Sequence, residues 1–131
     1  MTKIIDGKNA VLGRLASYTA KEALKGEDII ILNCEDIIIT GNKKNIEENF
    51  DARRNRVGHS QKGPRHSKSS EKIVKRAIRG MLPDHRGGRG KIAFKKIKCC
   101  VGVPKEFQES KKILAGKQKK TKFSRIKDFS K

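Results

Sequence analysis

Apolar residues near the start of the chain follow first a strand-like and then a helix-like spacing. Ile4 and Ile5 form a short apolar segment, and residues 29–32 form an apolar run without alternation, as expected of a strand covered on both faces. Between them, apolar and small residues recur every three or four positions, at Leu12, Leu15, Ala16, Thr19, Ala20, Ala23 and Leu24. Asn9 is a suitable cap for this helix and Gly26 a suitable stop. The pattern predicts a strand, helix, strand crossover with parallel strands.

A second β-branched run and a weaker helix come next. Residues 37–39 are all isoleucine, and Gly41 and Asn42 break the run. The following segment carries Ile46 and Phe50 at helical spacing and ends in arginines. Because positive charge is favoured at the carboxyl end of a helix, this ending supports a helix there.

A stronger helical pattern follows a basic loop. Residues 57–68 contain almost no apolar side chain, which predicts an exposed loop. Ser69 or Ser70 can cap the next helix and Pro83 can end it. Its predicted apolar face consists of Ile73, Val74, Ala77, Ile78, Met81 and Leu82. The last strand candidate is residues 99–103, in which at least one cysteine is expected to face the core.

The remainder of the chain has a different character. Residues 105–131 show little periodicity and many lysines, which predicts an extension that orders, if at all, on a surface. We therefore expect one α/β domain over residues 1–104 and a lysine-rich C-terminal extension over residues 105–131.

Charge is abundant and unevenly distributed. The 131 residues carry a formal net charge of +19, with 36% charged and 34% hydrophobic residues. Residues 1–52 have net charge −2, residues 53–98 have +14 and residues 99–131 have +7. A chain so strongly basic repels itself unless a polyanion is near, and the segregation predicts a neutral fold joined to a surface that meets phosphate.

Other classes of protein find little support in the composition. The longest apolar runs are far shorter than the roughly 20 residues of a membrane span, and no signal peptide is visible, so we expect a cytoplasmic protein without a membrane partner. Three cysteines without CxxC spacing predict neither a disulfide framework nor a zinc site. Residues 7–13 lack the end of a Walker loop and the third glycine of a dinucleotide fingerprint. We expect no catalytic residue, metal, cofactor or small-molecule substrate.

The basic middle of the chain predicts an RNA-binding surface. Cations stand beside nearly every glycine at residues 58–63 and 86–90, so the backbone can approach phosphates closely there. Aromatic residues make up only 5% of the chain, which favours folded RNA recognised by shape over a platform of stacked bases. The predicted RNA contacts are Arg14, Arg53, Arg54, Arg56, His59, Lys62, Arg65, His66, Lys68, Lys72, Lys75, Arg76, Arg79, Arg86, Arg89, Lys91, Lys95 and Lys96. Among them we expect the strongest contacts from Arg79 and Arg89.

Two alternatives remain open at this point. A sequence-neutral DNA-compacting protein would also use basic glycine-rich loops. A nucleotide-using α/β enzyme could place carboxylates such as Asp6, Glu35 and Asp36 near strand ends, although these residues also serve as caps and turn formers.

Several short motifs resemble the archaeal and eukaryotic branch of the large-subunit ribosomal protein thirteen family, from Ile4 to about Phe107. They are Ile5-Asp6-Gly7, Leu12-Gly13-Arg14-Leu15-Ala16-Ser17, Thr40-Gly41-Asn42, Arg76-Ala77-Ile78-Arg79-Gly80-Met81-Leu82-Pro83 and Val101-Gly102-Val103-Pro104. The segment around Arg-Gly-Met-Leu-Pro is the most distinctive.

The resemblance implies a fold and a function. The fold is a three-layer α/β/α sandwich with a mostly parallel four-stranded sheet, basic loops and a basic C-terminal extension. The function is that of a structural constituent of the large ribosomal subunit that binds and bridges rRNA, contacts neighbouring ribosomal proteins, supports subunit assembly and has no catalytic role. In this family the positions that match residues 53–96 face rRNA, in agreement with the distribution of charge.

Overall fold

A four-stranded parallel sheet forms the centre of the molecule. In a computed structural model, which describes residues 1–56, 65–117 and 120–130, the strands are β1 (Thr2–Asp6), β2 (Asp28–Leu32), β4 (Ile97–Cys99) and β5 (Ile113–Leu114). Their order is β4-β2-β1-β5, and each neighbouring pair is parallel. The predicted α/β class and the four-stranded, mostly parallel sheet are therefore confirmed.

The crossover between β1 and β2 is helix α1 (Leu12–Leu24), as predicted. The predicted face is buried at Leu15, Ala16, Thr19, Ala20 and Ala23 and half-buried at Leu12, but the prediction is wrong for Leu24, which is exposed. Gly26 follows the helix with φ of 101°, a conformation that glycine adopts without strain. The predicted cap is wrong. Val11 occupies the N-cap position, whereas Asn9 lies in a preceding turn with φ of 58° and accepts a hydrogen bond from Arg125.

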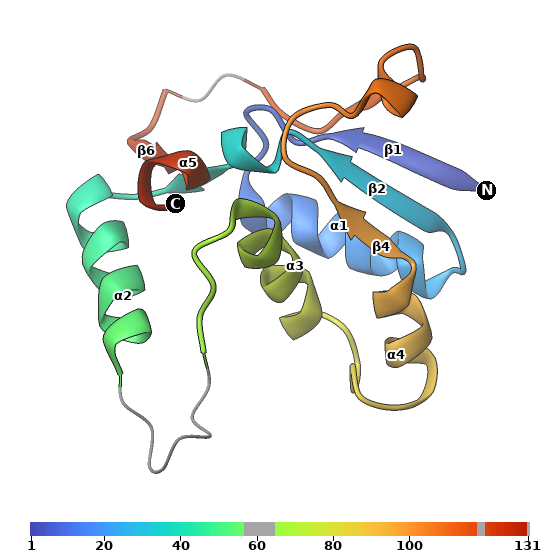
Figure 1. The fold of residues 1–131 in the computed structure, drawn as a ribbon, viewed down its shortest axis with the longest axis horizontal. Coiled ribbons are helices and arrows are strands. Elements are labelled where there is room, and N and C mark those ends of the chain that lie inside the picture. Colours follow the sequence, from blue (N-terminus) through green and yellow to red (C-terminus); the bar gives the residue numbers. More distant parts are fainter. Residues whose placement is uncertain (57–64, 118–119, 131) are drawn as a thin grey trace.

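Helices α1, α3 (Ser70–Gly80) and α4 (Gly88–Lys95) lie on one face of the sheet (Figure 1). The segment that contains the 3-10 turn η2 (Lys105–Phe107) lies on the other side of the strands. The core between sheet and helices is dominated by isoleucines, among them Ile5, Ile31 and Ile97, which are fully buried. No helix within the described residues is both long enough and apolar enough to span a bilayer.

Helix α3 is shorter than predicted. It ends at Gly80 with Met81 as C-cap, before Pro83, so Met81 lies outside the predicted apolar face and is exposed. Ser69 is the N-cap residue, but its side chain makes no capping hydrogen bond.

The expected glycine and arginine loop is also shorter, because its last residues begin α4. Gly90 lies so close to the Pro83 carbonyl oxygen that an added Cβ would be 1.7 Å from it. Packing of α4 on the preceding turn therefore requires glycine at this position. The following strand, β4, begins at Ile97, two residues before the predicted one, and Val101 beyond it is exposed.

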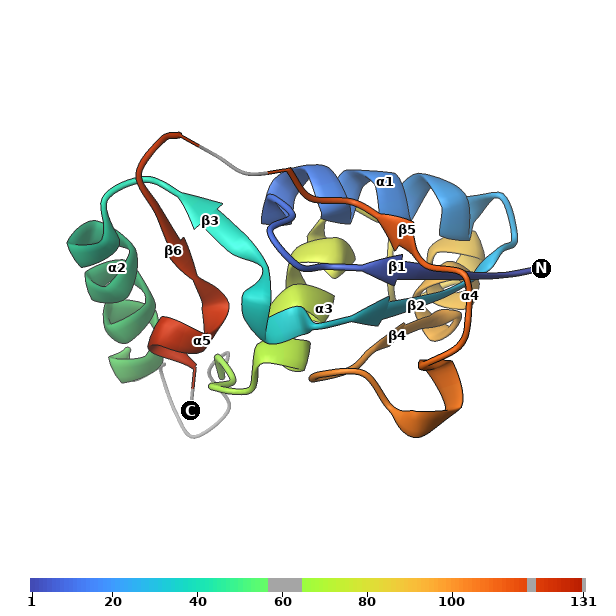
Figure 2. The same cartoon turned by 90° about the horizontal axis from the view of Figure 1, so that it is seen from above.

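A second, two-stranded sheet lies beside the main one (Figure 2). The run predicted at residues 37–39 becomes strand β3 (Ile38–Thr40), which follows the 3-10 turn η1 (Cys34–Asp36). Strand β3 pairs antiparallel with β6 (Phe123–Arg125). Helices α2 (Lys43–Asn55) and α5 (Ile126–Phe129) lie at this end of the molecule.

The prediction that residues 105–131 order, if at all, only on a surface is wrong, because the segment contains β5 (Ile113–Leu114), β6 and α5. Strand β5 completes the main sheet, and Ile126 and Phe129 of α5 are buried in the core. The connection between β5 and β6 crosses the β1–α1 turn so closely that a Cβ at Gly116 would lie 2.2 Å from the Lys8 carbonyl oxygen. The extension is thus part of the folded structure. The domain boundary between residues 104 and 105 stays a prediction.

Candidate nucleic-acid interface

Helix α3 carries a stripe of cations. Lys72, Lys75, Arg76 and Arg79 recur at intervals of three and four residues, which places them on neighbouring turns of one side of the helix. Ile73, Val74 and Ile78 occupy the buried side. The sequence therefore folds this segment as an amphipathic helix whose outward face is positively charged.

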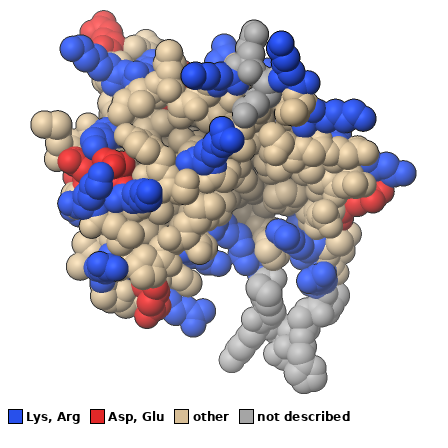
Figure 3. All heavy atoms as spheres, turned by 180° about the vertical axis from the view of Figure 1, so that it is seen from behind, with Lys and Arg blue, Asp and Glu red and all other residues tan. Residues whose placement is uncertain are grey.

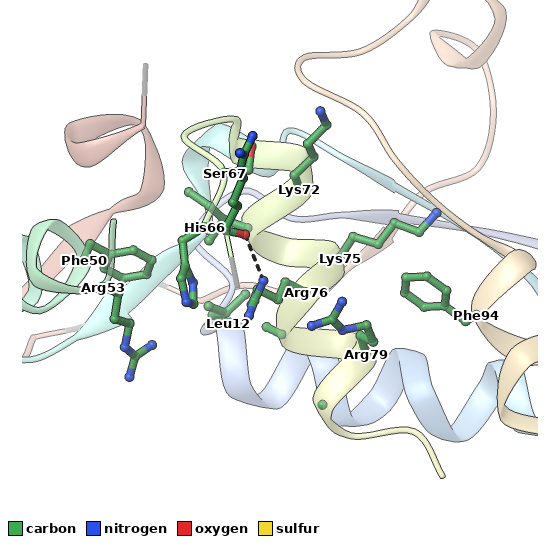
Figure 4. Close-up of a pocket in the computed structure, with 14 residues that line it drawn as sticks. Leu12, Phe50, Arg53, His66, Ser67, Lys72, Lys75, Arg76, Arg79 and Phe94 are labelled. Carbon is green, nitrogen blue, oxygen red and sulfur yellow. Dashed lines mark hydrogen bonds between the residues drawn. The ribbon is translucent and has the colours of Figure 1, made fainter. Parts of the chain in front are cut away.

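The stripe forms one wall of a hollow with a volume of about 500 Å³, here called the basic groove (Figure 4). The carboxyl end of α2, the segment that leads into α3, α4 and the first residue of α1 supply the rest of its lining. Its cationic side chains are Arg53, Arg65, Lys72, Lys75, Arg76 and Arg79, with His66 between Arg53 and Arg76. Its other lining residues are Leu12, Phe50, Ser67, Ile73, Ala77, Gly80 and Phe94.

The six cations of the basic groove have no carboxylate partner among the described residues. Arg76 donates a hydrogen bond from Nη1 to the carbonyl oxygen of Arg65, 3.2 Å away, which orients its guanidinium in the groove (Figure 4). Lys75 places its ammonium 4.9 Å from the ring centroid of Phe94. The groove therefore holds a high density of positive charge without internal compensation.

His66 is affected by this concentration of charge. Burial lowers the pKa of its imidazole, and the nearby guanidiniums of Arg76 and Arg53 lower the pKa further. At neutral pH His66 is therefore an uncharged side chain with one donor and one acceptor nitrogen, set among permanent cations.

The α2 side of the groove is supported by the C-terminal extension. Phe50 stacks on Phe129, with ring centroids 4.4 Å apart. Arg54 lies over the Phe50 ring at 5.7 Å and pairs with Asp51 at 3.6 Å. Because the Arg54 side chain is only 10% exposed, it packs beneath the surface, whereas Arg53 is exposed and lines the groove.

The other predicted RNA contacts lie outside the basic groove. Arg89, expected to be one of the strongest, lines a separate hollow of about 270 Å³ beside Pro83 and Gly87. Lys96 donates to the Gly26 carbonyl oxygen at 2.7 Å. The remaining ones are exposed: Arg14, Arg56, Lys68, Arg86, Lys91 and Lys95. His59 and Lys62 lie outside the described residues.

Lys and Arg also predominate over Asp and Glu on the face shown in Figure 3. Positive charge therefore also lies outside the basic groove, in agreement with the exposed arginines and lysines named above. Such a surface attracts phosphate from several directions, while the groove gives one location a defined shape.

Sequence reasoning missed the apolar members of the groove. Phe50 and Phe94 are half-buried, pack against the core and also line the groove. For Phe50 a signal was present, because it precedes Arg53 by one helical turn and so lies on the same side of α2. For Phe94 no signal was present, since its position depends on how α4 packs against α1 and β4.

The cysteines do not form a functional centre in the described part of the chain. No group of three metal-ligating side chains occurs there, and the three thiols are free. Cys34 is buried, and a hydrogen bond with Cys99 together with burial raises the pKa of its thiol. Cys99 packs against the core, so the expectation of a core-facing cysteine in this segment is confirmed.

Comparison with known proteins gives consistent matches. A family model described as Ribosomal protein L13 matches residues 1–106. The large ribosomal subunit protein uL13 of Methanococcus maripaludis is 48% identical over 104 residues, which cover 77% of this chain and 75% of that protein. The uL13 of Methanocaldococcus jannaschii is 39% identical over 131 residues, which cover 98% of this chain and 94% of that protein.

Proposed function

The chain belongs to the ribosomal protein L13 family, and from this premise we propose that its basic groove and the cationic face of α3 bind the RNA of the large ribosomal subunit. As a member of that family it is a structural ribosomal protein and not an enzyme. Neighbouring ribosomal proteins are its further partners, and support of subunit assembly follows from holding RNA segments in place.

The observation that carries the proposal is the absence of carboxylates from the lining of the groove. Six cations face one hollow, and none pairs with a described acidic residue. Holding like charges together is unfavourable in the free protein, and phosphates relieve that repulsion while releasing their counterions. This arrangement therefore favours a polyanion as the ligand.

The groove has cations on two walls, which suggests how RNA segments are bridged. Arg53 comes from α2, whereas Arg76 and Arg79 come from α3. The α/β core and the Phe50–Phe129 stack hold these helices in place. Two backbone segments that repel each other can then be neutralised by one rigid protein surface.

The proposal is tested by filter binding of the full chain to deproteinised large-subunit rRNA from the same cells over a range of salt concentrations. The double variant Arg76→Gln, Arg79→Gln removes two groove cations. We expect weaker binding by roughly tenfold or more, and a salt dependence reduced by about 1 to 2 in logarithmic slope. Unchanged affinity and slope would remove the groove from the RNA interface.

A matched control is the double variant Lys43→Gln, Lys44→Gln. It removes the same charge from exposed lysines that lie next to Glu47 and Glu48 at the start of α2, away from the groove. We expect a much smaller effect from it. Competition with duplex DNA in the same assay separates rRNA recognition from sequence-neutral nucleic-acid binding.

A further inference from the structure

The floor of the basic groove is apolar. This apolar part of the lining consists of Leu12, Ile73 and Ala77 together with the rings of Phe50 and Phe94. A phosphate placed there would lose water without gaining any hydrogen bond from the floor. Phosphates are therefore suited to the rim of the groove but not to its floor, and a ligand that fills the hollow needs an apolar part.

From this division we propose that the groove holds one unpaired nucleobase of the bound RNA, with the adjoining phosphates on the cations of the rim. The inference rests on the proposed RNA-binding function and names the part of the RNA that the groove takes. Unpaired bases in loops and bulges can leave their stack at a cost of only a few kcal/mol, and proteins recognise RNA sequence mostly at such bases.

The hollow has room for a ligand of this kind. The volume of about 500 Å³ lies within the range of roughly 300–1,000 Å³ that is typical of small-ligand sites. Phosphate contacts alone require no hollow of this depth. A flat face of α3 would serve them equally well, since its cations already protrude from one side of the helix.

His66 adds a means of contacting the base. In the free protein, burial and the surrounding arginines lower the pKa of its imidazole, which favours the neutral form. A neutral imidazole has one donor and one acceptor, which matches the mixed donors and acceptors on base edges. An imidazolium could only donate, so the neutral form gives His66 a role that the arginines beside it cannot supply.

The charge of the rim argues for a nucleotide over an apolar protein side chain. Any occupant must bring negative charge close to Arg53, Arg76 and Arg79 while presenting an apolar surface to the floor. A nucleotide combines both parts in one unit. A leucine or phenylalanine from a neighbouring protein would bury the floor and leave the cations uncompensated.

The test fills the floor without changing any charge. Ala77→Leu adds bulk at the floor, and Ala115→Leu is the matched control, because Ala115 is exposed near β5 and does not line the groove. Each full-length variant is titrated with deproteinised large-subunit rRNA. We expect Ala77→Leu to weaken binding by about 5- to 100-fold, the effect typical of losing one stacked base, while Ala115→Leu has no effect.

A second variant distinguishes filling of the groove from a disturbance of the core by Ala77→Leu. Gly80 lines the groove, and a Cβ added there meets no atom within 4 Å, so Gly80→Leu obstructs the hollow without a clash at its first carbon. Circular dichroism establishes that each variant is folded. If both folded variants bind rRNA as tightly as the parent chain, the groove holds no base.

Photo-crosslinking provides an independent readout. Ultraviolet irradiation of the parent complex, followed by mass spectrometry, is expected to join a nucleotide to Phe50, His66 or Phe94. Crosslinks elsewhere but none in the groove overturn the inference.

The proposed function is tested separately from this inference. If the Arg76, Arg79 double variant weakens rRNA binding while Ala77→Leu and Gly80→Leu do not, the groove binds the RNA backbone only. If a neighbouring protein occupies the floor, the filled variants bind rRNA normally, and the inference fails.

Discussion

Phe50 and Phe129 stack with their rings inclined by 25°, although one residue lies on α2 and the other near the end of the C-terminal extension. Phe50 also lines the basic groove. The extension therefore determines the position of a groove wall to which it contributes no cation. This contact makes a structural role for the extension testable.

Replacing Phe129 by alanine should lower the free energy of unfolding by about 3–5 kcal/mol, because the substitution removes a buried ring and with it the stacking contact to Phe50. Urea denaturation measures the loss. Phe123→Ala is the matched control, since Phe123 is 37% exposed and its truncation should cost clearly less. Equal losses in the two variants would mean that the Phe50–Phe129 stack contributes little to stability.

Gly90→Ala should destabilise the fold by about 1–3 kcal/mol or more, because the new methyl group would collide with the backbone of Pro83. Gly80→Ala serves as its control, since the space around that position is open and alanine favours a helix. Thermal unfolding monitored by circular dichroism compares the two. A Gly90→Ala protein as stable as the parent would contradict the close approach of α4 to the preceding turn.

His66 should titrate below its ordinary pKa of 6.5 in the free protein, because burial and nearby arginines disfavour its protonated form. Since the folded state then binds the proton less readily than the unfolded state, stability should fall as pH drops below about 6.5. NMR titration of the histidine ring measures the pKa, and His66→Gln should reduce this pH dependence. A pKa at or above 6.5 in the free chain would argue against the described surroundings of His66.

Glu22 should contribute to stability in mildly acidic solution. Hydrogen bonds from Lys25 and Lys3 lower the pKa of its carboxyl from 4.5 to about 2. A carboxyl with a lowered folded-state pKa stabilises the protein above its unfolded value, and the benefit is lost as pH falls from about 4.5 to about 2.

Glu22→Gln should therefore flatten the dependence of stability on pH across that range, as measured by urea denaturation at several pH values. Glu48→Gln is a suitable comparison, because the Glu48 side chain is well exposed and its only described ion pair, with Lys44, is 3.9 Å long. If the two variants follow the same pH profile, Glu22 has no special ionic partner.

The elements that could be predicted are those whose apolar residues recur at regular spacing within a short segment of the sequence. Leu15, Ala16 and Ala23 repeat at helical spacing, and residues 29–32 form an uninterrupted apolar run, so the β1–α1–β2 unit could be read directly. The α3 cations were predicted for the same reason. By contrast, Ile126 and Phe129 are isolated apolar residues in a lysine-rich segment, and their burial depends on partners far away in the sequence.

The candidate site divides in the same way. Arg76 and Arg79 could be assigned to one surface from the spacing of α3, but Arg89 belongs to α4, a helix that the sequence pattern did not predict, and lies in a different hollow. The apolar floor of the groove required tertiary structure, since Leu12 comes from α1 and Ala77 from α3. Charge patterns indicated which ligand class to expect, and packing determined the shape of the site.

The strand order has a consequence for the folding kinetics. Strands β1 and β2 are joined by a local crossover, whereas β5 pairs Ile113 with Ile5 across most of the chain. Contacts between residues so distant in sequence form slowly, because a large loop must close before they stabilise anything. Until β5 arrives, the edge of β1 at Ile5 and Asp6 is open to any other extended segment, and β5 then pairs with these two residues. This part of the edge is therefore a hazard of self-association in the newly made chain, and pairing with β5 removes it.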